Sequence, residues 1–160
     1  MSVRVVRAEP QHKQAWDDLY RAYAEFYNVE QTPAMRDRVW GWIHDPAHQV
    51  ECFLAVDDAG TPVGLAHFRA FARPLAATTG GFLDDLYVTP AARGRAGRGS
   101  GAAEAFLAAL ADEARLRGWS VVRWITADDN YRARSFYDRI ARRTPWVTYD
   151  MQPAGAAPAD

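Results

Sequence analysis

The chain has 160 residues, a length that suits one domain with a core large enough to fold without disulfide bonds. Hydrophobic residues make up 49% of it and six residues are Trp, so the composition indicates a packed core and excludes an intrinsically disordered chain. The 19 basic and 20 acidic residues give a net charge of −1. Because no face is obviously basic, there is no case for a nucleic acid or a membrane surface as partner.

The first half of the chain predicts two helices between strands. Apolar residues recur at helical spacing after Pro10, and Thr32 followed by Pro33 is a typical N-cap and first-turn pair. Two β-rich runs flank a turn at 58–61, as in a hairpin. The expected elements are a strand at 3–8, a helix from 9–11 to about 27, a helix from 33 to about 43, and strands at 50–57 and 62–71.

The second half predicts a strand, a glycine-rich loop and a long helix, then a strand, a helix and a last strand. Residues 73–81 read as a polar connection that ends in glycine. Asp128, Asp129 and Asn130 offer caps to the helix that follows them. The expected elements are a strand at 82–88, a loop at 93–101, a helix ending at Gly118, a strand at 120–126, a helix around 133–140 and a strand at 146–151.

No internal repeat and no linker interrupts this pattern, so we expect one domain over residues 1–152 and a frayed tail at 153–160. Cys52 is the only cysteine and lies in an apolar run, which favours a buried side chain and a reducing compartment. No apolar run approaches the roughly 20 residues that span a bilayer, and no charged leader precedes one. A cytoplasmic location is therefore expected.

The loop between the strand at 82–88 and the long helix is a candidate anion site. Residues 93–101 contain four glycines and three arginines and lead directly into the helix. Backbone N–H groups and the positive end of the helix dipole converge at such a point, and glycine allows a phosphate to approach the chain closely. The sequence therefore predicts a ligand that carries phosphate.

Three motifs in the right order extend this prediction over almost the whole chain. They are Asp84-Asp85-Leu86-Tyr87-Val88-Thr89-Pro90, then Arg98-Gly99-Ser100-Gly101-Ala102-Ala103, and then Trp124-x-Thr126-x-x-x-Asn130-x-x-Ala133-x-x-Phe136-Tyr137-Asp138. Together they resemble the GNAT superfamily of acyl-CoA-dependent N-acetyltransferases. The third motif looks most like the histone- and polyamine-acetylating branch, which includes spermidine/spermine N-acetyltransferases.

The resemblance implies an α+β fold of three layers, α/β/α, around a central mixed and mostly antiparallel sheet. That sheet would be splayed between the strands that begin at 82 and 120, which leaves a gap for the acyl-CoA. It also implies acetyl-CoA as co-substrate, a small-molecule amine as acceptor, no metal, and a homodimer.

The residues expected to bind acetyl-CoA follow from the family motifs. The strand at 82–88 would offer backbone groups to the pantetheine amides, and the loop would hold the phosphates. The set is Leu86, Tyr87, Val88, Arg93, Arg98, Gly99, Ser100, Gly101, Ala102, Ala103, Asn130, Ala133 and Tyr137.

Two registers of the loop are possible. The arginine that follows the motif proline by three residues is Arg93, whereas counting back from Gly118 selects Arg98, with an insertion at 93–97. The later register is favoured because the earlier one places Gly99 and Gly101 inside the helix, at about 1 kcal/mol each relative to alanine.

The resemblance places Tyr137 where the family has the hydroxyl that protonates the leaving sulfur, and acyl transfer also needs a base for the amine. Asp84 and Asp85 are the candidates for this base. Strict alternation along the strand would let only one of them face the acceptor, and Asp84 matches the polyamine-acetylating relatives. Both carboxylates can also bind a cationic substrate, so both stay open.

Aromatic and acidic side chains that suit a cationic amine lie near the first helix. The expected acceptor-binding residues are Tyr23, Phe26, Tyr27, His67 and Asp84. His44 and His48 do not suggest a metal site, because Pro46 breaks the helix that an i, i+4 pair needs.

The sequence thus predicts an N-acetyltransferase for a small primary amine, possibly polyamine-like. A protein-lysine acetyltransferase and a non-catalytic acyl-CoA sensor are the alternatives. A P-loop hydrolase is excluded because no Gly-Lys-Ser/Thr follows the glycine loop.

Overall fold

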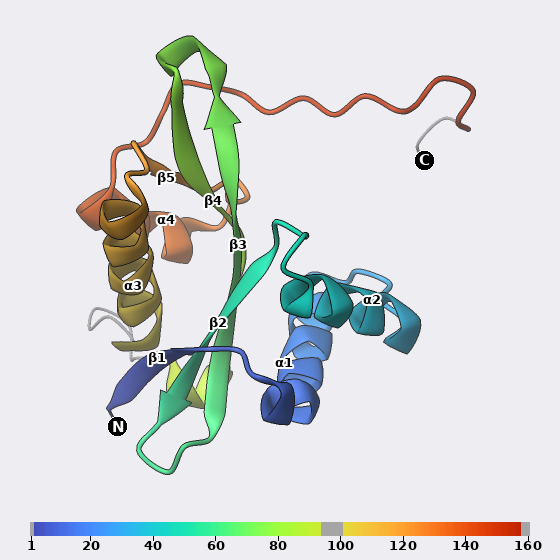
Figure 1. Cartoon of the computed structure of the whole chain (residues 1–160), viewed down its shortest axis with the longest axis vertical. Helices are drawn as coiled ribbons and strands as arrows, with labels where there is room; N and C mark the ends of the chain where they lie inside the picture. The colour runs from blue at the N-terminus through green and yellow to red at the C-terminus, as the bar shows by residue number, and fades with distance from the viewer. Residues whose placement is uncertain (1, 94–100, 158–160) are drawn as a thin grey trace. The chain divides into compact units, whose positions relative to one another are not determined.

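The computed structural model describes residues 2–93 and 101–157 (Figure 1). The chain divides into two compact units, Met1–Ile125 and Thr126–Asp160. The first unit holds β1 (Val3–Arg7), the 3-10 turn η1 (Pro10–His12), α1 (Lys13–Phe26), α2 (Pro33–His44), β2 (Glu51–Asp57), β3 (Pro62–Arg73), η2 (Pro74–Ala76), β4 (Thr78–Val88), η3 (Pro90–Ala92), α3 (Gly101–Arg117) and β5 (Val122–Arg123). The second unit holds α4 (Tyr131–Ile140).

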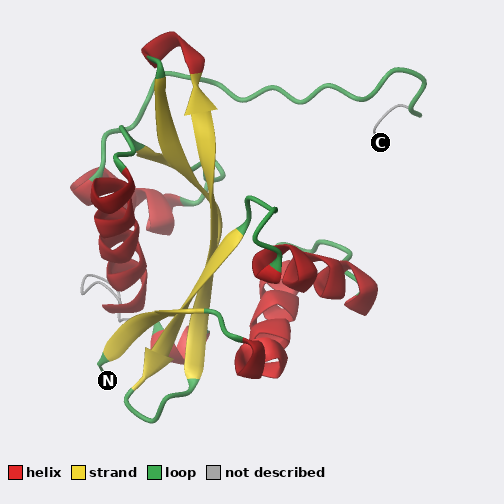
Figure 2. Ribbon diagram, viewed as in Figure 1, coloured by secondary structure: helices red, strands yellow, loops and turns green. Residues whose placement is uncertain are grey.

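The first unit is a mixed five-stranded sheet in the order β1-β2-β3-β4-β5, with helices on both faces (Figure 2). β1 to β4 pair antiparallel, and β5 runs parallel to β4. One face packs on α3, where Phe53, Phe68 and Phe106 are buried. The other face packs on α1 and α2, around Trp16 and Leu65. This arrangement confirms the predicted mixed, mostly antiparallel α/β/α fold.

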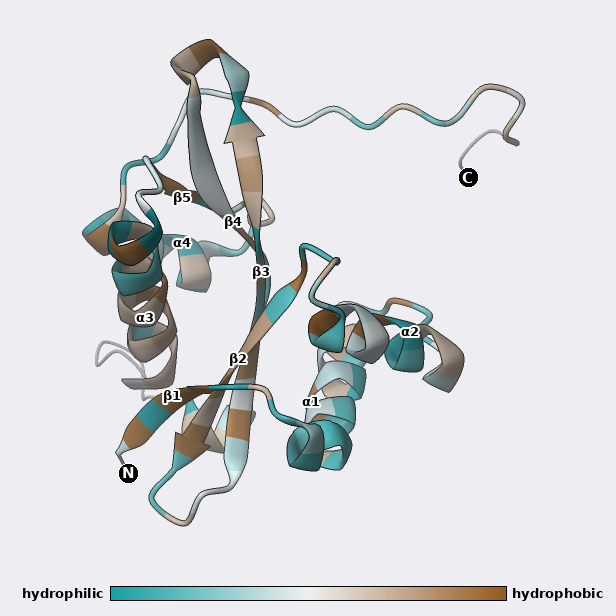
Figure 3. Cartoon of the chain, viewed as in Figure 1, coloured by the Kyte–Doolittle hydropathy of each residue, from teal (hydrophilic) through white to brown (hydrophobic). Residues whose placement is uncertain are grey.

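The central strands are apolar because both of their faces are covered. β2 is buried from Cys52 to Val56 and β3 from Val63 to Phe68. Figure 3 shows hydrophobic residues along both strands. A strand buried on two faces reads as a continuous apolar run rather than as an alternation. The core therefore holds the sheet together, and the polar residues within β3 and β4 are exceptions in an apolar surrounding.

The helix starts follow local signals. The Thr32 side chain accepts a hydrogen bond from the Met35 N–H, and Pro33 occupies the first turn of α2, as the sequence predicts. Trp16 and Leu19 form the buried stripe of α1. This stripe lies over β3. The polar atoms of α1 nearest the strands, Trp16 Nε1 and the Tyr20 hydroxyl, therefore reach β3 and β4.

A β-bulge at Asp84 changes the faces of β4. In the register of β3 and β4, His67 lies opposite Asp85 and Phe68 opposite Leu83, so Asp84 has no partner residue. A bulge inserts one residue and re-aims the side chains beyond it. Leu83 and Val88 therefore pack on the α3 side, whereas Asp85 and Tyr87 turn to the α1 side.

The pairing between β4 and β5 is short. It joins only Gly81 to Val122 and Phe82 to Arg123, and within the described residues no strand pairs with 83–88 on that side. β5 thus has two residues, and the prediction of a strand over 120–126 is wrong in length. Pairing of β4 with β5 thus ends at Phe82, as the splayed-sheet expectation requires.

Two further sequence predictions are wrong. Residues 73–81 are not a plain connection, because β3 runs to Arg73 and β4 starts at Thr78, with Ala77 in a left-handed conformation between them. The strand predicted at 146–151 does not form. Its apolar side chains, including Val147 and Tyr149, are exposed, because the segment pairs with no strand within the described residues. Among the described residues, no helix is long and apolar enough to cross a bilayer.

A glycine contact in β4 gives a test of this packing. A Cβ on Gly81 would lie 2.4 Å from the Trp119 ring, whereas a Cβ on Gly41, inside α2, would meet nothing within 4 Å. We expect Gly81→Ala to destabilise the protein by about 1–3 kcal/mol through overpacking. Gly41→Ala is the control and should stabilise it by up to about 1 kcal/mol through helix propensity.

Thermal unfolding followed by circular dichroism measures both effects. A melting temperature of Gly81→Ala equal to or above that of Gly41→Ala would contradict this packing.

Candidate active site

The Asp85 carboxylate is the centre of a polar cluster between β3, β4 and α1. Its Oδ2 accepts a hydrogen bond from the Tyr20 hydroxyl at 3.0 Å and lies 2.8 Å from His67 Nδ1. Trp16 Nε1 donates to His67 Nε2 at 2.9 Å. Trp16 and His67 are buried, and the side chain of Asp85 keeps 21% exposure. The cluster therefore connects two buried side chains, Trp16 and His67, to the partly exposed carboxylate of Asp85.

This cluster sets the charge of its members. Burial opposes the ionisation of Asp85, but hydrogen bonds from His67, Tyr20 and Tyr23 outweigh it and hold the pKa of the carboxyl below its ordinary value. Burial, followed by the nearby Asp85 charge, raises the pKa of the Tyr20 and Tyr23 hydroxyls well above the usual range. Asp85 therefore stays an anion near neutral pH, and both tyrosines stay donors.

Asp84 lies in a different environment from Asp85. It is exposed, and both of its carboxyl oxygens lie 3.2 Å from Arg69 Nε. Desolvation raises the pKa of its carboxyl, although Arg69 opposes this, and the charge of Asp85 raises it further. Two neighbouring carboxyls therefore have pKa values that move apart, as is common where one acts as a base and the other stays ionised.

The aromatic residues predicted to bind the acceptor come from the C-terminal half of α1. The Tyr23 ring stacks on Tyr20 at 6.1 Å and meets the edge of Tyr87 at 6.0 Å. Phe26 and Tyr27 follow and are exposed. This row of rings begins at the Asp85 cluster and continues to the end of α1.

His67 belongs to the cluster but is 2% exposed, with both ring nitrogens in contact with a polar partner. His67 itself therefore has almost no exposed surface, but it contacts Asp85, which is partly exposed.

Arg93 lies at the end of this aromatic row. Its guanidinium is 5.2 Å from the centre of the Phe26 ring and 5.5 Å from that of Tyr87, and its Nε donates to the Val88 carbonyl at 2.7 Å. The Val88 carbonyl therefore accepts from Arg93 with one of its two lone pairs.

The described part of α3 runs from Gly101 and includes Ala102 and Ala103, the last two residues of the loop motif 98–103. Ala102 is 1% exposed and is part of the α3 core. Arg98, Gly99 and Ser100 lie outside the described residues.

The remaining predicted residues belong to the second unit. Asn130 caps α4, because its side chain accepts a hydrogen bond from the Ala133 N–H at 3.3 Å. Tyr137 is half-buried on the same helix, with its ring 5.6 Å from that of Phe136. The capping role that the sequence gave Asn130 as an alternative is thus present.

Sequence reasoning did not select Trp16, Tyr20 or Arg69 for the site. Trp16 and Tyr20 read as core residues on the apolar stripe of α1, and their spacing of four was the only local signal that they share a face. Arg69 follows His67 by two residues on β3, but its pairing with Asp84 depends on the bulge.

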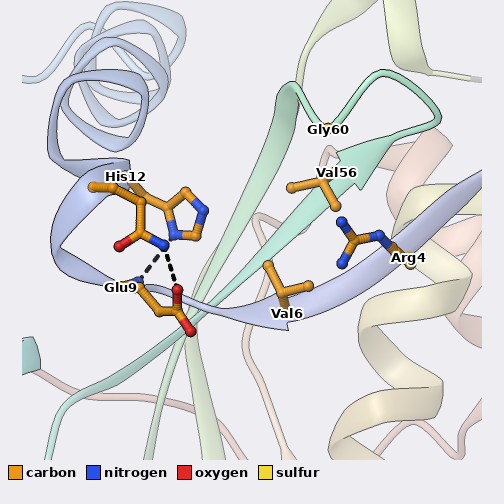
Figure 4. A pocket seen from close by; sticks show the side chains of 7 residues that line it. Arg4, Val6, Glu9, His12, Val56 and Gly60 are labelled. Carbon is orange, nitrogen blue, oxygen red and sulfur yellow. Dashed lines mark hydrogen bonds between the residues drawn. The ribbon is translucent and has the colours of Figure 1, made fainter.

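A shallow pocket of about 240 Å³ lies elsewhere in the first unit, beside β1 and the β2–β3 turn (Figure 4). It is lined by Arg4, Val6, Glu9, Gln11, His12, Val56 and Gly60. It contains none of the predicted site residues, and its Glu9 and His12 are engaged in the turn η1. Within 2–93 and 101–157, no three His, Cys, Asp or Glu side chains gather as a metal site.

Known proteins resemble this chain over most of its length. Residues 16–141 match the acetyltransferase (GNAT) family. The D-amino-acid N-acetyltransferase HPA3 of Saccharomyces cerevisiae is 31% identical over 147 residues, which cover 91% of this chain and 88% of that protein.

Two solved structures show the same fold. The ribosomal-protein-alanine N-acetyltransferase of Brucella melitensis biovar Abortus 2308 has a TM-score of 0.76 at 23% identity, covering 95% of this chain and 99% of that one. AAC(6')-Iy, in complex with the bisubstrate analogue CoA-S-monomethyl-acetylneamine, has a TM-score of 0.77 at 16% identity, covering 96% and 100%. From the family match and the yeast relative, the chain belongs to the acetyltransferase (GNAT) family and is an acetyl-CoA-dependent N-acetyltransferase.

Proposed function

We propose that this enzyme transfers the acetyl group of acetyl-CoA to the primary amine of a small acceptor, by direct attack within a ternary complex. The observation that carries the proposal is the ionised Asp85 carboxylate, which lies on β4 beside a row of aromatic rings. A fixed anion next to aromatic faces attracts and orients an ammonium group. Asp85 lies in the part of β4 that is beyond its pairing with β5.

The acceptor side follows from the same face of the sheet. Tyr23, Phe26 and Tyr27 extend from the Asp85 cluster and fit an amine with an apolar or flat body. The yeast relative is named for D-amino acids, and the aminoglycoside enzyme AAC(6')-Iy shares the fold. Amino acids and aminoglycosides therefore join polyamines as the acceptors to test.

The acetyl-CoA side combines backbone groups with side chains of the loop and of α4. Along residues 83–88, β4 pairs with no strand of the described residues on its β5 side, so its outer N–H and C=O groups suit the amides of a pantetheine arm. The N-terminus of α3 offers N–H groups to phosphate oxygens. Arg98, Gly99, Ser100, Asn130 and Ala133 complete the proposed binding set, with Gly101, Ala102 and Ala103 of α3. When bound, the thioester supplies an activated acetyl group.

The chemistry divides between the two carboxylates. Asp84, whose pKa is raised, takes a proton from the acceptor ammonium, directly or through water. Asp85, whose pKa is lowered, stays ionised and holds the acceptor. The free amine then forms the C–N bond as the C–S bond breaks. Tyr137 donates its proton to the departing sulfur, and the second proton lost by the new amide nitrogen restores the Tyr137 hydroxyl. The reaction therefore gives an amide, a thiol and the one proton first taken by Asp84.

The reaction is tested by thiol release from acetyl-CoA against D- and L-amino acids, spermidine, an aminoglycoside and a lysine-containing peptide. Turnover with one small amine supports the proposal and names the acceptor class. Turnover with the peptide alone would instead identify a protein-lysine acetyltransferase. Acetyl-CoA binding by calorimetry without turnover would identify an acyl-CoA sensor.

Asp84→Asn tests the proton acceptor. The raised pKa of Asp84 places the acidic limb of the wild-type kcat/KM profile above 3.8, the ordinary value for the group, because the base must be deprotonated. Removing the base should lower kcat/KM at neutral pH by about 100-fold and move the profile to higher pH, where the free amine is abundant. Asp112 is exposed on α3, so Asp112→Asn is the control and should leave the profile unchanged. An unshifted Asp84→Asn profile would exclude this role.

Tyr137→Phe tests the acid. Loss of the hydroxyl should lower kcat by about 100-fold, with little change in the affinity for acetyl-CoA measured by calorimetry. Tyr131→Phe is the matched control, since Tyr131 is exposed at the start of the same helix. If the Tyr137→Phe enzyme turns over at the wild-type rate across the pH range, another group protonates the sulfur.

We also propose a homodimer. Trp146, Val147, Tyr149 and Met151 are exposed in a segment with a β-type sequence, and pairing with a second copy would cover them. Light scattering after size exclusion should give twice the mass of one chain, and a monomer mass at micromolar concentration would contradict the assembly.

A cytoplasmic location is proposed from the single, buried Cys52. Fractionation of the native host tests it, and recovery of the protein outside the cytoplasm would contradict it.

A further inference from the structure

A line of two hydrogen bonds joins the core of the first unit to Asp85. Trp16 Nε1 lies 2.9 Å from His67 Nε2, and His67 Nδ1 lies 2.8 Å from Asp85 Oδ2. Resting on the acceptor role proposed for Asp85, we infer that Trp16 and His67 are positioning residues that fix the orientation and the negative charge of this carboxylate. Neither residue reaches the acceptor itself, because Trp16 is 0% and His67 2% exposed.

The direction of both hydrogen bonds follows from Trp16. An indole nitrogen can only donate, so His67 Nε2 must accept with its lone pair. The proton of a neutral imidazole then lies on Nδ1, and this N–H points to Asp85 Oδ2. The geometry therefore selects one of the two neutral tautomers of His67, the one that protonates Nδ1.

The same arrangement prevents His67 from acting as a base. Its one lone pair is occupied by Trp16, so it can take a proton only if the Trp16 hydrogen bond breaks. A neutral donor stabilises the Asp85 anion without neutralising it. The carboxylate therefore keeps its negative charge for an ammonium group, while His67 and Tyr20 donate to Oδ2 and Tyr23 is a third donor to the carboxyl.

Packing alone does not require this line. Trp16 packs in a cluster with Leu19, Leu54 and Leu65, and the buried His67 ring lies beside it. Apolar side chains would fill the same space without buried polar atoms. Buried polar groups are costly unless each is paired, and here both ring nitrogens of His67 and the Trp16 N–H have partners. The two hydrogen bonds end at the Asp85 carboxylate, which is 21% exposed. They therefore fix the position of that carboxylate.

The surroundings of the His67 ring contain few other titratable groups. Cys52 lies opposite it on β2, Asp85 on β4, and the Tyr20 ring meets its edge at 4.6 Å from α1. Burial, together with the Asp85 charge, raises the pKa of the Cys52 thiol well above its usual range. Cys52 and Tyr20 are therefore neutral. Asp85 is the charge in hydrogen-bond contact with His67, and the more exposed Asp84 interacts with it through charge alone.

The first test reads the tautomer directly. In protein labelled with ¹⁵N-histidine, the two ring nitrogens of His67 are distinguished by NMR at neutral pH. We expect Nδ1 to be protonated and Nε2 to be an unprotonated acceptor. A protonated Nε2, alone or together with Nδ1, would overturn the inference. This readout does not depend on acetyl transfer, so it separates a failure of the inference from a failure of the proposed function.

The second test uses paired variants. Trp16→Phe keeps an aromatic core but removes the donor, and Trp40→Phe makes the same change in the neighbouring ring, 5.0 Å away, without touching His67. We expect Trp16→Phe to lose the single tautomer and to lower kcat/KM for the amine about tenfold, and Trp40→Phe to change neither. Equal effects of both variants would reduce Trp16 to a packing residue.

His67 itself gives a rescue. A glutamine can accept from Trp16 and donate to Asp85, whereas a leucine can do neither. We expect His67→Gln to stay within about threefold of the wild-type kcat/KM and His67→Leu to fall at least tenfold. If both folded variants fall equally, the hydrogen bonds through His67 do not act on Asp85, and the inference fails.

Discussion

The β-bulge at Asp84 is the constraint on which the rest of the site depends. Without it, Leu83, Asp85 and Tyr87 would share one face of β4. With it, Leu83 stays in the α3 core while Asp85 turns to α1 and meets His67 and Tyr20. One extra residue thus lets a buried strand carry an ionised carboxylate on one face without placing a charge in the core on the other.

The bulge also separates the two carboxylates chemically. Asp85 gains three donors from β3 and α1 that favour its charge, whereas Asp84 faces Arg69 and the solvent. Desolvation raises the pKa of both carboxyls, and the hydrogen-bond donors around each one decide whether its pKa ends above or below the ordinary value. Adjacent residues of one type therefore have distinct protonation behaviour, and this supports their division into a proton acceptor and a fixed anion.

Sequence reasoning reached the fold because its signals are local or repeated. The Thr32-Pro33 cap, the stripe of α1 and the apolar runs of β2 and β3 each predict their element without tertiary information. The last strand failed because strand propensity does not supply a partner.

Two parts of the site depend on tertiary pairing and could not be read from the chain. Strict alternation assigned Asp84 and Asp85 to opposite faces but could not tell which face each takes, since this depends on the bulge. Trp16 and Tyr20 read as core residues, because their hydrogen bonds are made to residues 51 and 65 positions away.

The division between the two carboxylates is tested most directly by a site-resolved titration. Carboxyl ¹³C NMR of labelled aspartate, with Asp84→Asn and Asp85→Asn used for assignment, follows each group separately. The account predicts that Asp84 titrates above 3.8, the ordinary value for the group, and that Asp85 titrates below it. A reversed order, or two groups that titrate together, would contradict the assignment of Asp85 as the fixed anion.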